Sequence, residues 1–275
     1  AKGTLGRALV RQFANTHKVT AWDRADLDIA DFDQVRKKVA DLRPDAVVNA
    51  VAINAVDDIE TDDELFELAK QVNGYAVGNI ASTTTELSIP FVHISTDYVF
   101  SGTSAEGYNE AAIPNPISRY AETKLLGEQQ VQQNAQKFYM VRISRLFGEK
   151  GSSEFSKRSF VDLMLALAES KDHLNVVNDQ FSCPSYAPDV AQFIQRLLEE
   201  QRPFGMYHAA NQGACSWYEW ASEIFRLRNI EINIAPVPAT HFPRAAAAPM
   251  HSELLNTKMS PQPGWQDALA RYLSE

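Results

Sequence analysis

The sequence has few cysteines and no excess of positive charge. Its two cysteines, Cys183 and Cys215, do not form a CxxC pair, which favours a reduced, cytoplasmic protein over a disulfide-stabilised one. The formal net charge of −9 argues against nucleic-acid binding, because a phosphate backbone requires a basic face. No apolar run approaches the ~20 residues that a membrane-spanning helix needs, so we expect no membrane association.

Metal-binding patterns are also lacking. The six histidines are scattered, with no HExxH motif and no cluster of cysteine and histidine, so we predict no metal site. The sequence contains no internal repeat and no recognisable signal peptide. Its 275 residues suit one large α/β domain, or such a domain with a smaller lobe.

What is present is an alternation of short apolar runs with helix-like stretches. The runs predict strands at residues 18–22, 45–51, 90–95 and 138–144. The stretches between them predict helices at residues 33–42, 62–87 and 120–133. This alternation is typical of an α/β fold with a Rossmann-type, doubly wound parallel sheet.

The pattern changes after about residue 150. Prolines and short strands, such as one at residues 205–208, interrupt the helices predicted at residues 160–169, 189–200 and 216–226. We therefore expect a dinucleotide-binding domain over residues 1–150. Residues 151–275 should form mainly a smaller, mixed substrate-binding lobe, with chain crossings between the two parts and the ligand between them.

A glycine pair stands near the start of the chain. Gly3 and Gly6 have the spacing of the last two glycines of a dinucleotide-binding loop, and an amphipathic helix follows. Amides at such a helix N-terminus bind a pyrophosphate, so we expect Gly3, Leu5 and Gly6 to contact a cofactor. A strand and another glycine usually precede this pair, so we expect roughly eight further residues upstream in the natural chain. On its own the pair could equally be a simple turn.

Two residues of opposite charge follow the first predicted strand. Asp23 could accept hydrogen bonds from an adenosine ribose, whereas Arg24 could bind a 2′-phosphate, so the choice between NADH and NADPH stays open. We expect an adenine contact near Leu27 and Asp28. Asp26 is interpreted as a solvated acid of the loop.

A tyrosine and a lysine, Tyr120 and Lys124, lie four residues apart in a predicted helix and therefore share one face. The positive charge of the lysine is expected to lower the pKa of the phenol. The phenol can then donate a proton to a carbonyl oxygen as hydride reaches the carbon. A YxxxK pattern alone is common, and Lys124 could instead pair with Glu128 one turn later.

A hydroxyl-rich segment, Ser95-Thr96-Asp97-Tyr98, ends the strand predicted before this helix. Ligands bind at the carboxyl ends of strands in such sheets. The hydroxyl of Thr96 or Ser95 can therefore hydrogen-bond a substrate carbonyl near Tyr120. The alternative is an ordinary turn in which the hydroxyl caps the strand end.

Together these motifs resemble the dTDP-4-dehydrorhamnose reductase family of the extended short-chain dehydrogenases/reductases. The resemblance runs nearly end to end, over residues 94–102, 115–116, 120–128, 179–189, 205–210 and 216–219. It implies that Thr96, Tyr120 and Lys124 are catalytic and that the cofactor is NADPH or NADH. The implied reaction reduces the C4 ketone of a nucleotide-linked 4-keto-6-deoxy sugar in polysaccharide biosynthesis. Conversion of dTDP-4-dehydro-L-rhamnose to dTDP-L-rhamnose is the leading candidate.

The resemblance also assigns residues to the two ligands. Val51 and Ala52 would pass beside the cofactor, in addition to Tyr120 and Lys124. The residues implied to contact the sugar nucleotide are Asn54, Val56, Thr96, Tyr98, Tyr120 and Arg145.

Several positions depart from the family. Arg145 stands where the family usually has a tryptophan that packs on the substrate, and Ala248 replaces the arginine of an Arg-Pro pair. Residues 148–158 also form a longer segment than usual. The reaction centre is kept while the contacts to the sugar nucleotide differ. This favours the same type of reaction and leaves the identity of the nucleotide sugar open.

Two other classes of function fit parts of the sequence. A non-catalytic, NADP-binding regulatory subunit, similar to the beta subunit of methionine adenosyltransferase, would not need all three catalytic residues. A dehydratase or epimerase would need further acid/base carboxylates, yet Tyr98 follows Asp97 where a second acid would stand. A homodimer is a further possibility that the sequence leaves open.

Overall fold

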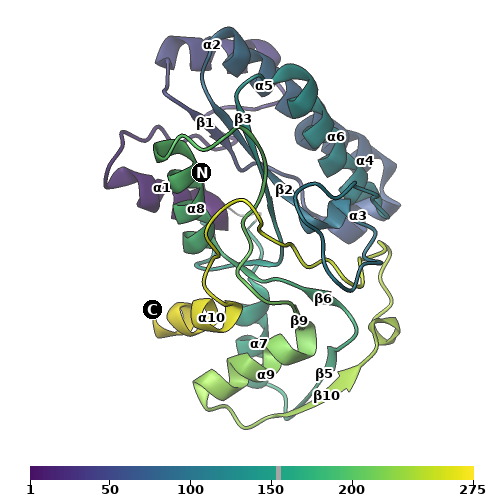
Figure 1. Ribbon diagram of the computed structural model, residues 1–275. Coiled ribbons are helices and arrows are strands. Elements are labelled where there is room, and N and C mark those ends of the chain that lie inside the picture. The colour runs from purple at the N-terminus through teal and green to yellow at the C-terminus, as the bar shows by residue number, and fades with distance from the viewer. Residues whose placement is uncertain (153–155) are drawn as a thin grey trace.

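Four parallel strands form the main sheet of the computed structural model, which describes residues 1–152 and 156–275 (Figure 1). The strands are hydrogen-bonded in the order β1-β2-β3-β8. Their bounds are β1 (Val47–Asn49), β2 (Phe91–Thr96), β3 (Phe138–Ile143) and β8 (Gly205–His208). The parallel arrangement confirms the α/β sheet that the alternation of strands and helices predicts.

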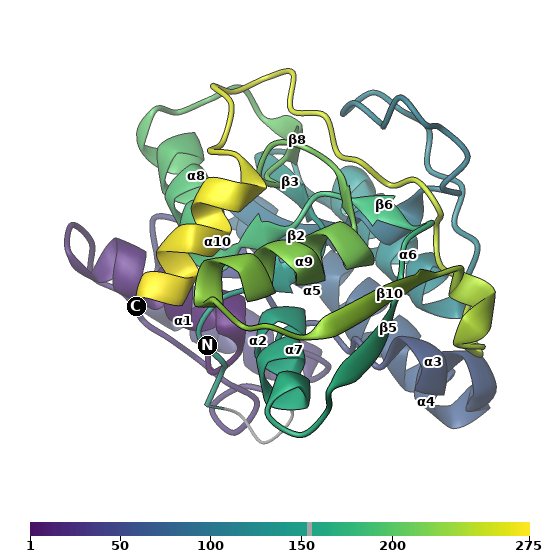
Figure 2. The ribbon, with the colours of Figure 1, turned by 90° about the horizontal axis from the view of Figure 1, so that it is seen from below.

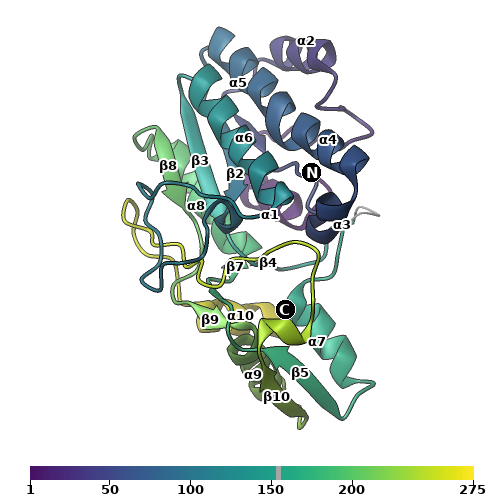
Figure 3. The same cartoon turned by 90° about the vertical axis from the view of Figure 1, so that its right-hand side faces the viewer.

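Helices cover both faces of this sheet (Figures 1 and 3). One face carries α1 (Thr4–Ala14) and α8 (Ala187–Glu199), and the other carries α2 (Phe32–Leu42), α5 (Ala76–Glu86) and α6 (Arg119–Asn134). Alternate side chains of β2 enter different cores. Val92 and Ile94 pack with α1 and α8, whereas Phe91 packs with the other group of helices. Burial on both faces explains why these strands read as continuous apolar runs.

The helix predicted at residues 62–87 is continuous but contains one wider turn. α4 (Asp63–Lys70) leads through a π-helical turn, η1 (Gln71–Tyr75), directly into α5. Asn73 lies in this turn and donates hydrogen bonds to the Ile53 carbonyl and the Thr123 hydroxyl, each at 2.9 Å. The turn therefore ties the segment after β1 to α6.

The C-terminal lobe lies below the main sheet in Figure 1 and in front of it in Figure 2. Its elements are α7 (Phe160–Ala168), α9 (Trp217–Arg228), α10 (Trp265–Ser274) and the parallel strands β5 (His173–Val177) and β10 (Asn233–Val237). Their buried side chains form a separate apolar core in which Phe147 meets Trp220 edge to face at 5.5 Å. This mixture of helices and short strands is the smaller lobe that the sequence predicts.

Several short elements connect the two parts. The remaining strands are β4 (Leu146–Phe147), which pairs with β7 (Ser185–Tyr186), and β6 (Phe181–Ser182), which pairs with β9 (Cys215–Ser216). The remaining helical turns are α3 (Val56–Thr61), η2 (Asp97–Val99) and η3 (Ala239–His241).

Three sequence predictions need correction. Residues 18–22 are extended but pair with no strand in the described part of the chain, so the hydrogen-bonded ladder that defines a strand is not formed. The strand predicted at 45–51 is limited to β1. Residues 205–208 join the main sheet beside β3 instead of standing in the lobe, and the preceding helix, α8, packs on α1. The predicted longer segment at 148–158 lies partly outside the described residues.

The structure also shows the state of the cysteines, the grouping of possible metal ligands and the character of the helices in the described residues. Cys183 and Cys215 are both free and buried. The residues that the structure describes contain no group of three or more histidine, cysteine, aspartate or glutamate side chains suited to a metal ion. Within the same ranges, no helix is both long enough and apolar enough to cross a membrane.

Candidate active site

Helix α6 carries the tyrosine and lysine of the YxxxK pattern. Ser118 caps its first turn by accepting a hydrogen bond from the Ala121 amide, which places Tyr120 at the start of the helix. Tyr120 and Lys124 are only 8% and 2% exposed. The Lys124 ammonium donates a hydrogen bond to the Ile94 carbonyl of β2 at 2.8 Å. The helix therefore directs both side chains at the carboxyl end of that strand.

The hydroxyl that joins them belongs to Thr96, the last residue of β2. Its oxygen lies close enough to the Tyr120 hydroxyl for the two side chains to hydrogen-bond. Ser95, the other candidate, donates instead to the Glu128 carboxylate at 2.6 Å on the opposite side of the strand. Adjacent residues of a strand point to opposite faces, which explains why only one of the two hydroxyls reaches the tyrosine. The structure thus brings Thr96, Tyr120 and Lys124 together.

The pKa values of the two titratable groups are set mainly by burial. Burial raises the pKa of the Tyr120 phenol, and the negative charge of Asp97 raises it further. The expected lowering of this pKa by Lys124 is therefore wrong for the protein alone, because desolvation dominates. Burial also lowers the pKa of Lys124 to about 8, despite the opposing charge of Glu128.

Glu128 pairs with Arg142 and not with Lys124, which rules out the alternative pairing. The Arg142 Nε and Nη2 atoms lie 2.8 and 2.6 Å from the two carboxylate oxygens of Glu128, and both side chains are 2% exposed. This buried pair links α6 to β3. Arg142 was not predicted as a site residue, and its only signal in the sequence is a charge inside an apolar strand.

A cavity of about 2020 Å³ adjoins the amino-terminal half of the molecule. Nine of the residues predicted to bind the cofactor line it: Gly3, Leu5, Gly6, Asp23, Arg24, Leu27, Asp28, Val51 and Ala52. Helix α1 begins beside it at Gly3, with no side chain capping its first amides. A Cβ atom on Gly6 would lie 2.8 Å from the Ala1 carbonyl oxygen, so the close approach of the backbone requires glycine. The uncapped amides at the start of α1 fit the diphosphate of a dinucleotide.

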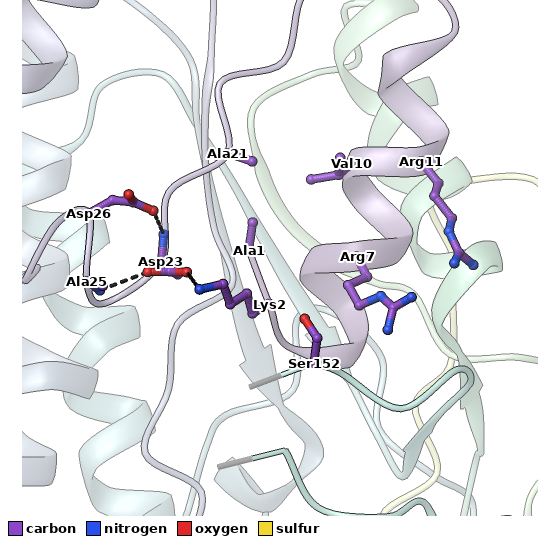
Figure 4. Close-up of a pocket in the computed structure, with 10 residues that line it drawn as sticks. All are labelled: Ala1, Lys2, Arg7, Val10, Arg11, Ala21, Asp23, Ala25, Asp26 and Ser152. Carbon is purple, nitrogen blue, oxygen red and sulfur yellow. Dashed lines mark hydrogen bonds and ion pairs between the residues drawn. The ribbon is translucent and has the colours of Figure 1, made fainter. Parts of the chain in front are cut away.

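Figure 4 shows Asp23 and Asp26, which follow the first predicted strand, beside a smaller cavity of about 470 Å³. Lys2 forms an ion pair with Asp23 and holds the pKa of that carboxyl down at about 2, with help from the Ala25 amide. Asp26 is exposed, as expected, and accepts a hydrogen bond from the Asp23 amide at 3.0 Å. Arg24 is exposed and makes no ion pair within the described ranges.

The residues implied to contact the sugar nucleotide lie near the tyrosine or on the cavity. Tyr98 meets Tyr120 edge to face, with ring centroids 5.7 Å apart, and Val56 packs in the same apolar cluster. Asn54 is exposed and lines the large cavity, as does Arg145. Two of the four residues thus lie beside Tyr120, and the other two line the large cavity.

Arg145 is held firmly although it is charged. Its two terminal nitrogens donate to the carbonyls of Gln180 and Cys215, each at 2.8 Å, and its guanidinium lies 3.9 Å from the ring centroid of Trp217. Its backbone adopts the left-handed conformation, with φ of 41°. Arg145 forms no ion pair with a carboxylate among the described residues.

One ion pair near the site was missed from the sequence. Arg244, in the segment after η3, binds both carboxylate oxygens of Asp57 at 2.9 to 3.2 Å and lies close to the Tyr98 hydroxyl. The Ala246 amide donates to the same carboxylate at 3.2 Å. These contacts join the C-terminal part of the chain to α3. Their 187-residue separation leaves no local sequence signal.

Comparison with known proteins gives a consistent result. The model of the RmlD substrate binding domain family matches residues 1–275. The chain is 33% identical to the dTDP-4-dehydrorhamnose reductase of Escherichia coli, over 99% of this chain and 95% of that protein. It is 34% identical to the spore coat polysaccharide biosynthesis protein SpsK of Bacillus subtilis, over 100% and 95%.

Solved structures agree with these sequence matches. A dTDP-4-dehydrorhamnose reductase from Clostridium acetobutylicum superposes with a TM-score of 0.92 and 34% identity, covering 99% of this chain and 95% of that one. The Bacillus anthracis enzyme of the same name, solved in complex with NADP, gives a TM-score of 0.93 and 32% identity, with coverage of 99% and 96%.

Proposed function

This chain belongs to the RmlD substrate binding domain family, and from that premise we propose that it is an NAD(P)H-dependent reductase of a dTDP-linked 4-keto sugar. The leading reaction is reduction of dTDP-4-dehydro-L-rhamnose to dTDP-L-rhamnose. The observation that carries the proposal is the meeting of Thr96, Tyr120 and Lys124 at the carboxyl end of β2. All three are needed for proton transfer to a ketone, whereas a regulatory subunit would need none of them.

The cofactor would lie along the large cavity. In this proposal the amides of Gly3, Leu5 and Gly6 bind its diphosphate, and the chain at Val51 and Ala52 passes beside the cofactor. When bound, the reduced nicotinamide supplies a hydride to C4 of the sugar. Asp23 already forms an ion pair with Lys2, whereas Arg24 has no acidic partner in the described part of the chain. This supports binding of a 2′-phosphate by Arg24 and therefore a preference for NADPH.

Tyr120 is the proton donor in this proposal. As hydride adds to the ketone carbon, the oxygen takes the proton of the Tyr120 hydroxyl, and the resulting phenolate is reprotonated from water. The raised pKa keeps the phenol protonated over the physiological range, so the proton is available when hydride arrives. Lys124, with a pKa of about 8, is mostly charged at neutral pH and can stabilise the phenolate and bind the nicotinamide ribose.

The sugar nucleotide would contact Asn54, Val56, Tyr98 and Arg145, with Thr96 and Tyr120 at the reacting carbonyl. Their position beside Tyr120 and on the large cavity supports this assignment. We further propose that residues 1–150 form the dinucleotide-binding domain and residues 151–275 mainly the substrate lobe, with α8 and β8 crossing back. The two free, buried cysteines support a cytoplasmic location.

The test is oxidation of NADH and NADPH, followed at the nicotinamide absorbance, with dTDP-4-keto-6-deoxy-L-hexulose generated in situ. Tyr120→Phe should lower turnover by roughly 10²–10⁴-fold and leave cofactor binding nearly unchanged, because only the proton donor is lost. Tyr139→Phe is the matched control, since that hydroxyl donates to the Arg202 carbonyl on another part of the sheet. Comparable turnover in Tyr120→Phe would contradict the mechanism.

A further inference from the structure

A carboxylate without an ion pair lies directly beside the catalytic threonine. Asp97 is 3% exposed, and no lysine or arginine within the described ranges forms a salt bridge with it. Hydroxyl groups surround it instead. Its Oδ1 accepts from Thr96 at 3.1 Å, and its Oδ2 accepts from Ser144 at 2.7 Å, Ser182 at 3.0 Å and Ser252 at 2.6 Å.

The three serines come from separate segments. Ser144 follows β3, Ser182 lies in β6, and Ser252 belongs to the chain leading towards α10. The hydroxyls satisfy the hydrogen-bonding capacity of the carboxylate, which a buried charge requires, but they carry no opposite charge. The negative charge of Asp97 therefore still acts on its other neighbours, which include Tyr120, Tyr98, Arg145 and Cys183.

This arrangement fixes the direction of the Thr96 hydroxyl. A carboxylate only accepts hydrogen bonds, so the single hydrogen of the Thr96 hydroxyl points to Asp97. The Tyr98 amide donates to the same oxygen at 3.2 Å, which occupies one lone pair. The remaining lone pair can accept from the Tyr120 hydroxyl, which lies within hydrogen-bonding reach. Thr96 in this state cannot also donate to a ketone, as the polarising role expected from the sequence requires.

We propose that Asp97 is a positioning residue for the reduction: it holds Thr96 as a hydrogen-bond acceptor for the Tyr120 hydroxyl, so that Tyr120 alone protonates the ketone. This inference rests on the proposed function. Thr96 then orients the proton until the ketone oxygen replaces it as the acceptor. The charge of Asp97 also raises the pKa of Tyr120, which keeps the proton donor in its protonated form at higher pH.

The experiment is the pH dependence of kcat for wild type and Asp97→Asn, which keeps the shape and removes the charge. In wild type the alkaline fall in activity begins near pH 8, as Lys124 loses its charge. Loss of the Asp97 charge lowers the pKa of Tyr120, so the further fall caused by ionisation of the proton donor should begin at lower pH in the variant than in wild type, with a larger effect on kcat than on KM. Ser182→Ala is the matched control. It removes one hydroxyl and keeps the charge, so this further fall should not begin at lower pH.

A second measurement does not depend on turnover. Ultraviolet titration reports tyrosine ionisation, and subtracting the curve of the same protein carrying Tyr120→Phe isolates Tyr120 among the nine tyrosines. We expect Tyr120 to ionise at lower pH in Asp97→Asn than in wild type. Asp97→Ser adds a fourth serine to the group, likewise removes the charge, and replaces Asp97→Asn if that variant does not fold.

The outcomes separate the two proposals. Failure of wild type to oxidise either cofactor with the keto sugar overturns the proposed function, and the titration still decides the role of Asp97. Turnover by wild type with an unmoved alkaline fall in activity and unchanged Tyr120 ionisation in the charge-free variants overturns the inference about Asp97 and leaves the reductase standing. A loss of stability with no change in pH dependence would likewise show that Asp97 is only structural.

Discussion

Replacing Glu128 by glutamine tests how strongly one buried ion pair holds the catalytic helix against the sheet. Glu128 accepts two hydrogen bonds from Arg142 and a third from Ser95, and both members of the pair are 2% exposed. Glutamine keeps the size but removes the charge, so the Arg142 guanidinium stays buried without a counter-charge. Breaking a buried pair in this way costs about 3–5 kcal/mol of the free energy of unfolding.

The assay is urea denaturation followed by the fluorescence of the four tryptophans. The matched control is Glu223→Gln, which breaks the ion pair between Glu223 and Arg226 on the surface of α9. An exposed pair contributes about 0–1 kcal/mol, so the control should change little. Equal losses in the two variants would refute the reasoning. Replacing both Glu128 and Arg142 by apolar residues should recover much of the stability, because no uncompensated charge then remains.

Two further variants test the site. Lys124→Met should abolish turnover yet stabilise the fold at pH 7 by roughly 2 kcal/mol. Lowering the pKa of the buried lysine from 10.5 to about 8 costs about 1.4 kcal/mol per unit, and loss of the hydrogen bond to the Ile94 carbonyl offsets about 1 kcal/mol of the gain. The charged Lys124 destabilises the folded wild type, so the stability gained in Lys124→Met should disappear as the pH rises from about 8 to 10.5 and the lysine loses its proton. Urea denaturation of both proteins at pH 7 and near pH 10.5 checks this. No gain in stability at pH 7 would contradict it. Arg145→Trp should lower the free energy of unfolding by about 1–3 kcal/mol, because the Gln180 and Cys215 carbonyls lose their donors. It should also change KM for the sugar nucleotide and not for the cofactor, and unchanged KM for both would remove Arg145 from the sugar site.

The sequence predicted the parts of the site that depend on local spacing. Tyr120 and Lys124 are one helical turn apart, and Thr96 ends a strongly apolar strand, so their meeting follows from the periodicity of helix and strand. The helices at residues 33–42 and 120–133 were found for the same reason, within one or two residues of α2 and α6.

Contacts between distant segments could not be predicted in this way. Asp97 receives its hydroxyls from residues 47, 85 and 155 positions away, and Arg244 reaches Asp57 across 187 positions. Strands of two residues, such as β6 and β9, are too short to show any period.

The π-helical turn at Gln71–Tyr75 bears on which changes of chain length the fold can accept. Each residue advances an α-helix by about 100°, so removing one residue from the turn would rotate everything after it by about that angle. The buried stripe of α5, which includes Val77, Ile80 and Ala81, would then swing away from the core. The Asn73 side chain would also leave Ile53 and Thr123. A deletion that restores ideal helical geometry would therefore undo the packing on both sides, so the fold requires the irregular turn.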